Sequence, residues 1–282
     1  MTNNLSALWV RQKQDGFLKR LSRLKRGKFK LTNHSFWFSW FIFFSIILAR
    51  YFLIAGGAYL LFYLVLGQSV AKQSLRLKPP ISESIRRDIQ LSILSAVVFA
   101  AFAALIISEW GLGITLLYTD FYKYGLWYLV ASFVAVLILQ DSYFYFIHRM
   151  FHHRLIFRWM HYGHHRSKEP TPWSSFAFDL PEAIIQALFF VGVIFIVPLH
   201  FITLLAILMT TTVWAVVTHL GFEVFPRSFK SQWLGKWFIG CMHHSIHHRK
   251  YMVHYGLYFT FWDKLLGTEE SNYENQFHTS EF

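Results

Sequence analysis

The chain carries histidines at spacings that could bind metal ions. Thirteen of its fifteen histidines lie between His148 and His254. On a helix, an H-x3-H pair places two imidazoles one turn apart on the same face, and an H-x2-HH triplet does so with its first and third members. Such groups can hold a metal without further rearrangement of the backbone. The pair is His148 and His152, the triplets are His161, His164 and His165, and His244, His247 and His248, and His219 stands alone between the triplets.

The number of these imidazoles predicts two metal ions. The pair and triplets supply eight, and His219 would make nine, whereas one tetrahedral zinc takes at most four protein ligands. Imidazole suits iron, zinc, copper or nickel and is wrong for magnesium or calcium. Two irons with open positions at a membrane surface would suit dioxygen activation and attack on a lipid C–H bond. Zinc-dependent hydrolysis fits the ligands almost as well.

A carboxylate precedes the first pair on the same predicted helix face. Asp141 lies about two turns before His148, where it could accept a hydrogen bond from an imidazole N–H and fix the tautomer. The alternative is a polar residue at a helix end near the membrane interface. Glu223 follows His219 by four residues and could orient that ring.

Composition predicts an integral, multi-pass membrane protein. Hydrophobic residues are 55% and aromatic residues 20% of the 282, and several apolar runs approach the roughly 20 residues of a membrane helix. The formal net charge is +12, but the basic residues cluster beside the apolar runs, where topology and anionic headgroups select them. No nucleic-acid partner is therefore expected. The single cysteine, Cys241, excludes an internal disulfide and a cysteine-ligated iron–sulfur cluster.

The apolar runs predict an all-α fold with four to six membrane helices and a cytoplasmic, histidine-rich helical cap that holds a dimetal site. Runs at 89–108 and 126–147 each suit one span, and 183–218, broken at Pro198, predicts a two-helix hairpin. The run 36–66 is too long for one straight span and short for two. It could form a hairpin, a helix bent at Gly56-Gly57 or a single tilted span. We divide the chain into a basic amphipathic or disordered tail (1–35), N-terminal membrane helices (36–125) and a catalytic part (126–282).

The charges of the loops predict a cytoplasmic active site. The loop 109–125 contains one basic residue, Lys123, whereas 67–88 contains five, so 109–125 should lie outside and 67–88 inside. The hairpin then returns the chain to the side of 149–182, and all histidine groups share one compartment.

Three stretches resemble the fatty acid hydroxylase superfamily, also called the sterol desaturase family, in a bacterial-type membrane member. They are DSYFYFIHRMFHHRLIFRWMHYGHHRSKEPTPW, HLGFEVFP and MHHSIHHRKYMVHYGLYFTFWDKLLGT. The three histidine boxes match in order and spacing, His219 matches the family's lone histidine, and His254 stands where the family usually has Asn. The resemblance implies that the metal ligands are His148, His152, His161, His164, His165, His219, His244, His247 and His248.

The resemblance further implies a membrane-bound, O2-dependent oxidoreductase that hydroxylates or desaturates a fatty acyl, sterol or related lipid. Its cofactors would be two Fe2+ ions, with zinc in their place in a purified sample as an alternative. Electrons would come from a separate cytochrome b5-, ferredoxin- or reductase-type donor. A zinc-dependent membrane lipid hydrolase and a non-catalytic metal transporter or sensor are the competing readings.

One departure from the family lies after the second box. Many relatives have His-Pro-x-Glu where this chain has Asp179-Leu180-Pro181-Glu182. Glu182 is kept, and we expect it at the catalytic site with Asp141. Asp179 would replace the missing histidine either as an oxygen ligand or as a hydrogen-bonding support for the ligands, and we favour support.

Overall fold

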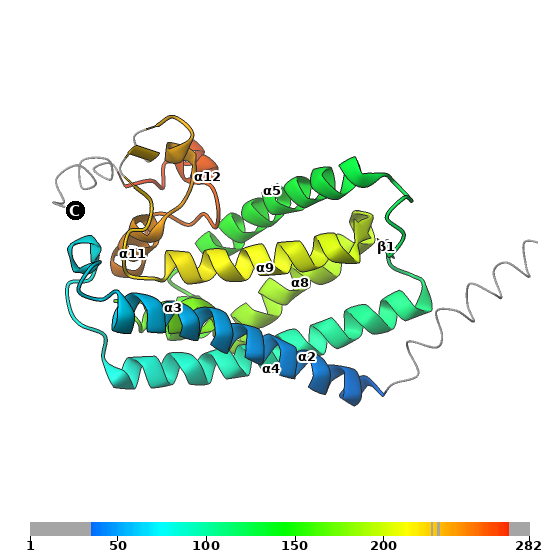
Figure 1. Ribbon diagram of the computed structural model, residues 1–282, viewed down its shortest axis with the longest axis horizontal. Coiled ribbons are helices and arrows are strands. Elements are labelled where there is room, and N and C mark those ends of the chain that lie inside the picture. Colours follow the sequence, from blue (N-terminus) through cyan, green and yellow to red (C-terminus); the bar gives the residue numbers. More distant parts are fainter. Residues whose placement is uncertain (1–34, 227, 230–231, 271–282) are drawn as a thin grey trace, which may run out of the picture.

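Five long helices form the body of the molecule, which we describe from a computed structural model over residues 35–226, 228–229 and 232–270. The predicted basic tail, apart from residue 35, lies outside the described residues. Figure 1 shows the long helices running along the longest axis, with α11 and α12 at one end and β1 at the other. The long helices are α2 (Phe36–Tyr51), α4 (Ser82–Leu112), α5 (Leu126–Phe151), α8 (Leu180–Ile196) and α9 (Phe201–Thr218).

Four helical runs are long and apolar enough to cross a membrane. They cover Phe36–Val65, Ser82–Leu112, Leu126–Phe151 and Phe201–Thr218, with mean hydropathy between 1.7 and 2.5. The shortest has 18 residues, or about 27 Å at 1.5 Å per residue, close to the roughly 30 Å of the hydrocarbon layer. The 17-residue α8 is shorter but equally apolar in character. These helices confirm the predicted membrane architecture.

The first apolar run is one continuous helix, which excludes the hairpin and leaves one candidate span. After α2 it continues through η1 (Phe52–Gly56), α3 (Gly57–Tyr59) and η2 (Leu60–Val65), of which η1 and η2 are π-helical. Gly56-Gly57 therefore marks no turn. A Cβ on Gly56 would lie 3.0 Å from the Trp173 ring, so glycine here permits the close approach of that indole.

The predicted hairpin at 183–218 is confirmed. Helices α8 and α9 are joined through β2 (Leu199–His200), which pairs in parallel with β1 (Leu117–Tyr118). His200 caps α9, since its Nδ1 accepts the Ile202 N–H at 3.1 Å and its Nε2 donates to the Thr119 carbonyl at 3.0 Å. These two short strands form the one β-sheet among the described residues, which also contain two isolated β-bridges.

Small residues let the N-terminal helices pack closely. Ala96 and Ala100 of α4 are buried against Ile47, Tyr51 and Ala55. Close approach of helix backbones at small residues is the usual means of helix association in membranes. This packing matters for function because α4 also contacts η4 (Pro172–Phe176), which follows the second histidine box.

Short elements complete the end of the molecule that holds the histidines. They are η3 (Ala71–Gln73), α6 (Phe157–Met160), α7 (Tyr162–His165), η5 (Gly235–Trp237), α11 (Cys241–Lys250) and α12 (Phe261–Leu265). The C-terminal ends of α5 and α9 reach the same end, beside α11 (Figure 1).

Candidate metal centre

The nine predicted ligands come together in two buried clusters. Within each cluster, one candidate ligand atom from every residue lies within 4.8 Å of the others, and none of the nine side chains is more than 8% exposed. The five-histidine cluster contains His148, His152, His161, His165 and His247, and the four-histidine cluster contains His164, His219, His244 and His248.

Helical spacing explains how the triplets divide between the clusters. In a helix, residue i+4 lies about 40° from residue i, whereas residue i+3 lies about 60° away in the opposite sense. The first and last members of a triplet therefore go to one cluster and the middle member to the other. His161 and His165 join the five-histidine cluster, with His164 in the four-histidine cluster. In α11 the assignment is reversed, because His244 and His248 join the four-histidine cluster and His247 joins the five-histidine cluster.

Hydrogen bonds fix the tautomer of five of the nine rings, and a sixth ring, His161, binds a carboxyl group. A carbonyl can only accept, so an Nδ1 bound to one carries the hydrogen and leaves the lone pair on Nε2. The Nδ1 partners are the carbonyls of Tyr255 for His148 (2.9 Å), Ala177 for His164 (3.2 Å), Ala215 for His219 (2.7 Å), Val253 for His247 (2.7 Å) and Ser167 for His248 (3.0 Å), and the Glu182 carboxylate for His161 (2.7 Å).

Two of these Nε2 atoms face each other without a hydrogen between them. Nε2 of His164 lies 3.4 Å from Nε2 of His219, and both rings have their hydrogen on Nδ1. In the five-histidine cluster, Nε2 of His148, which also has its hydrogen on Nδ1, lies 3.0 Å from Nε2 of His161. Lone pairs this close repel unless a cation binds them both. The donor set therefore fits metal ions in both clusters.

Burial keeps these rings neutral, as metal ligation requires. Loss of water lowers the pKa of His164 to about 4 and that of His219 to about 3. Burial and the neighbouring imidazoles also hold the pKa well below 6.5 for His161, His165, His244, His247 and His248.

Asp179, for which we favoured support, and Glu182, which we expected at the catalytic site, both contact the second box. Glu182, in the first turn of α8, accepts the Nδ1–H of His161. Asp179 accepts the backbone N–H of Gly163 at 2.6 Å and belongs to neither histidine cluster. Asp179 thus caps α7, which carries His164 and His165.

Asp141 has a different partner from the one its helix face predicted. Its Oδ1 accepts the backbone N–H groups of Leu257, Tyr258 and Phe259 at 3.2, 2.7 and 3.1 Å. It therefore holds the loop whose Tyr255 carbonyl accepts the N–H of His148 and acts on that ring only through the backbone.

Glu223 and two further histidines support the third box from outside the clusters. Glu223 accepts the Met242 N–H at 3.1 Å and so caps α11 rather than orienting His219. His243 accepts the Gly240 N–H, and its ring lies 5.0 Å from that of His254. His254 has φ +58°, in the left-handed region that Asn and His tolerate better than most residues.

Comparison with known proteins places the chain among lipid-modifying enzymes. A sequence model described as "Fatty acid hydroxylase" matches residues 133–268, which include all nine clustered histidines. Human lathosterol oxidase is 32% identical over 226 residues, which is 75% of this chain and 71% of the human protein.

Other relatives match over a shorter length. Rat lathosterol oxidase is 35% identical over 159 residues, covering 55% of this chain and 51% of the rat protein. The Delta(7)-sterol 5(6)-desaturase ERG3B of Gibberella zeae is 28% identical over 159 residues, covering 56% of this chain and 48% of that protein. The chain thus matches about half the length of these two relatives. No solved structure matches the chain.

Proposed function

Because the chain belongs to the fatty acid hydroxylase superfamily, we propose that it is a membrane-bound di-iron enzyme that uses dioxygen to hydroxylate or desaturate a lipid C–H bond. The coarser part of this function, oxidation of a membrane lipid, is supported by relatives named as a sterol oxidase and a sterol desaturase. We assign catalysis to residues 126–282, which include the whole match to the family.

The observation that carries the proposal is the lone-pair contact between His164 and His219, together with the 3.0 Å approach of the His148 and His161 Nε2 atoms in the other cluster. Neutral imidazoles suit iron, and the nine histidines of the two clusters would hold two ions. Iron bound there would supply the redox chemistry that reduces dioxygen and removes hydrogen from an unactivated C–H bond.

The protein's own groups would hold and orient these ligands. Five backbone carbonyls and the Glu182 carboxylate keep hydrogen on Nδ1, so Nε2 points into the clusters. We assign Glu182 a direct role in positioning His161. Asp141 and Asp179 position the closing loop and the second box through backbone N–H groups.

The substrate we propose is a lipid that enters from the bilayer. The clusters lie at the ends of α5 and α9, close to where those helices would leave the hydrocarbon layer. The names of the relatives make a sterol the first substrate to test.

We propose that electrons come from a separate donor on the cytoplasmic side. The segment 149–168, which begins just after His148 and includes the second box, has five Lys or Arg and no acidic residue. Arg154, Arg158, Arg166 and Lys168 in this segment are exposed. This surface suits an acidic donor protein, and such docking should weaken with salt.

The test is lipid oxidation by the purified, iron-loaded protein with sterol, a chemical reductant and dioxygen. Gain of one oxygen atom in the product mass indicates hydroxylation, and loss of two hydrogens indicates desaturation. We expect His164→Ala to abolish both, since it removes one ligand of the four-histidine cluster. His200→Ala is the matched control, because His200 is a hydrogen-bonded, buried histidine at the opposite end of the molecule. Product formation by His164→Ala would contradict the proposal.

The same assay separates the alternatives. A zinc hydrolase would cleave its lipid without oxygen or reductant and would be active with zinc alone. A transporter would place its ligands near the middle of its spans, whereas these clusters lie at helix ends and in loops.

A further inference from the structure

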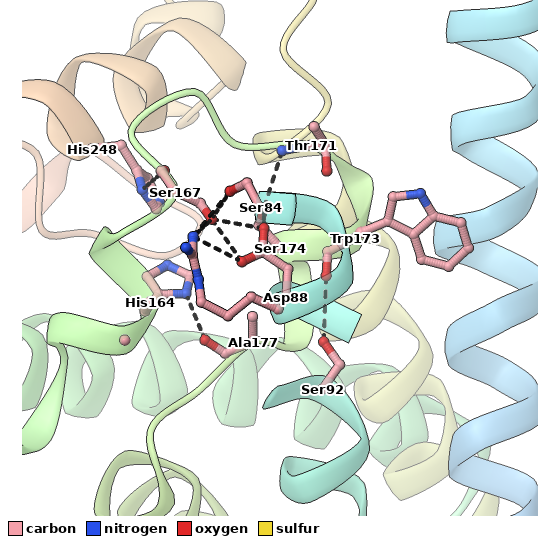
Figure 2. Close-up of polar contacts among 12 residues, drawn as sticks. Ser84, Asp88, Ser92, His164, Ser167, Thr171, Trp173, Ser174, Ala177 and His248 are labelled. Carbon is pink, nitrogen blue, oxygen red and sulfur yellow. Dashed lines mark hydrogen bonds and ion pairs between the residues drawn. The ribbon is translucent and has the colours of Figure 1, made fainter. Parts of the chain in front are cut away.

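A buried carboxylate on α4 lies outside both histidine clusters. Asp88 is 1% exposed and accepts hydrogen bonds from two hydroxyls (Figure 2). Ser167 Oγ lies 2.6 and 2.8 Å from its two oxygens, and Ser174 Oγ lies 2.6 Å from Oδ2. Burying a carboxyl group is costly unless it is paired and hydrogen-bonded. Here the two hydroxyls and Arg87, whose Nη2 lies 3.7 Å from Asp88 Oδ1, supply those partners.

The two serines lie on a segment that we call the anchor loop, residues 167–177, between the second box and α8. Two of its carbonyls accept hydrogen bonds from candidate ligands. The Ser167 carbonyl accepts from Nδ1 of His248, and the Ala177 carbonyl accepts from Nδ1 of His164. Figure 2 shows Asp88 beside this loop, with His248 and His164 at its two ends. Both rings belong to the four-histidine cluster.

The Asp88 carboxylate fixes the direction of the hydroxyls that shape the loop. A serine hydroxyl has one hydrogen to donate. Ser174 Oγ donates it to Asp88 and accepts the Thr171 N–H at 3.1 Å, within the capping box that begins η4. Ser167 Oγ donates to Asp88 and accepts from Arg87 Nη2 at 3.0 Å. Removing the carboxylate would free both hydroxyls to turn.

The five-histidine cluster is supported by other acidic residues. Glu182 binds His161 directly. Asp141 and Asp263 hold the closing loop, with Asp263 accepting the N–H groups of Tyr255 and Gly256 at 2.8 and 2.9 Å. The Tyr255 carbonyl in turn orients His148. Asp88 thus serves one cluster and not the other.

We propose that Asp88 is a positioning residue for the four-histidine cluster. Its carboxylate holds the anchor loop so that two loop carbonyls aim His164 and His248 at a metal ion. This inference rests on the proposed metal centre and names a further residue that shapes it. Residues that orient metal ligands in this way typically contribute about 10- to 100-fold in metal affinity.

The experiment loads the purified full-length chain with 57Fe and measures the iron-to-protein ratio, the affinity and the Mössbauer spectrum. His248→Ala and His152→Ala identify the spectral component of each cluster. We expect Asp88→Ala to weaken iron binding about 10- to 100-fold at the component lost in His248→Ala, and to keep the component lost in His152→Ala. Asp88→Asn should have a smaller effect, because its amide oxygen can still accept from one hydroxyl.

Ser92→Ala is the matched control. Ser92 is buried on the same helix and donates to the Trp173 carbonyl of the same loop at 3.3 Å, but that carbonyl orients no histidine in the hydrogen bonds above. The Ser92→Ala variant should therefore bind iron with the same affinity as the wild-type chain. If Asp88→Ala does not fold, Asp88→Asn and Ser174→Ala carry the same test.

Three outcomes are distinct. If Asp88 variants keep both components at wild-type affinity, the inference fails and the metal centre stands. If they lose both components in parallel, Asp88 supports the fold in general and the inference also fails. If the wild-type chain binds no metal, the proposed function fails and the inference fails with it.

Discussion

The two histidine clusters share one donor type but are held in different ways. In the five-histidine cluster, a carboxylate binds one ring directly, at 2.7 Å between Glu182 and His161. In the four-histidine cluster, the Nδ1 partners of His164, His219 and His248 are all backbone carbonyls, and Asp88 would act on two of these rings only through the anchor loop.

This difference has chemical consequences. An ionised carboxylate partner makes an imidazole a stronger electron-pair donor to a metal ion than a carbonyl partner does. The five-histidine cluster therefore has more ligands than the four-histidine cluster, and its His161 would be a stronger donor than the rings bound to carbonyls. The four-histidine cluster offers fewer nitrogens and would leave more coordination positions open. We therefore expect the two metal ions to differ in affinity and in access to small molecules.

The largest expected effect comes from removing the direct carboxylate. Glu182→Ala should lower metal affinity of the five-histidine cluster about 10- to 100-fold and leave the four-histidine cluster unchanged. Glu182→Gln should fall between, since its amide oxygen can still accept the His161 N–H. Metal titration with the spectral assignments above measures the affinity of each cluster in both variants. Equal weakening of the two clusters would contradict the proposed difference in how they are held.

Acid should destabilise the metal-free protein through the four-histidine cluster. The folded-state pKa of His164, about 4, and that of His219, about 3, lie below the ordinary 6.5, so the unfolded chain binds more protons between these values. Stability is therefore full above about pH 6.5 and declines as the pH falls toward 4 and 3. Thermal unfolding of metal-free protein across this range should show the decline, and bound metal should oppose it. A flat profile without metal would contradict the burial of neutral rings.

The smallest effects should come from the cap on the second box. Asp179→Ala removes the acceptor of the Gly163 N–H and should cost about 0.5–2 kcal/mol. Because α7 and the residue before it serve both clusters, this variant should weaken both slightly and equally. Gly163→Ala tests the same contact from the other side, since a Cβ there would clash with the Asp179 carboxylate. Denaturation with matched metal titrations measures both variants, and an effect confined to one cluster would count against this account.

The sequence predicted the nine clustered histidines because their signal is local. Spacings of three and four residues specify a helix face wherever the helix lies, and three apolar runs and a hairpin follow equally from local composition. Their role as ligands remains a prediction.

Most supports of these rings could not be predicted, because they are backbone carbonyls, and two of these are distant along the chain. The carbonyl that orients His248 belongs to Ser167, 81 residues earlier, and the one that orients His148 belongs to Tyr255, 107 residues later. The pattern of side-chain types in a sequence does not indicate which backbone carbonyl will accept a hydrogen bond from a given histidine. The predicted hydrogen bond from an imidazole to Asp141 was wrong for the same reason. Asp141 shares a helix face with His148, but that pattern says nothing of the loop 257–259, whose backbone N–H groups Asp141 accepts.

Because each histidine triplet is divided between the two clusters, the geometry of its helix fixes the distance between the clusters. Both α7 and α11 deliver rings to both sites within about one turn of helix, so the spacing of the two metal positions follows from covalent geometry. Tilting of α5 or α9 in a thinner or thicker bilayer would carry the two sites along together. A lipid-embedded enzyme built this way could keep its bimetallic spacing constant while its membrane environment changes.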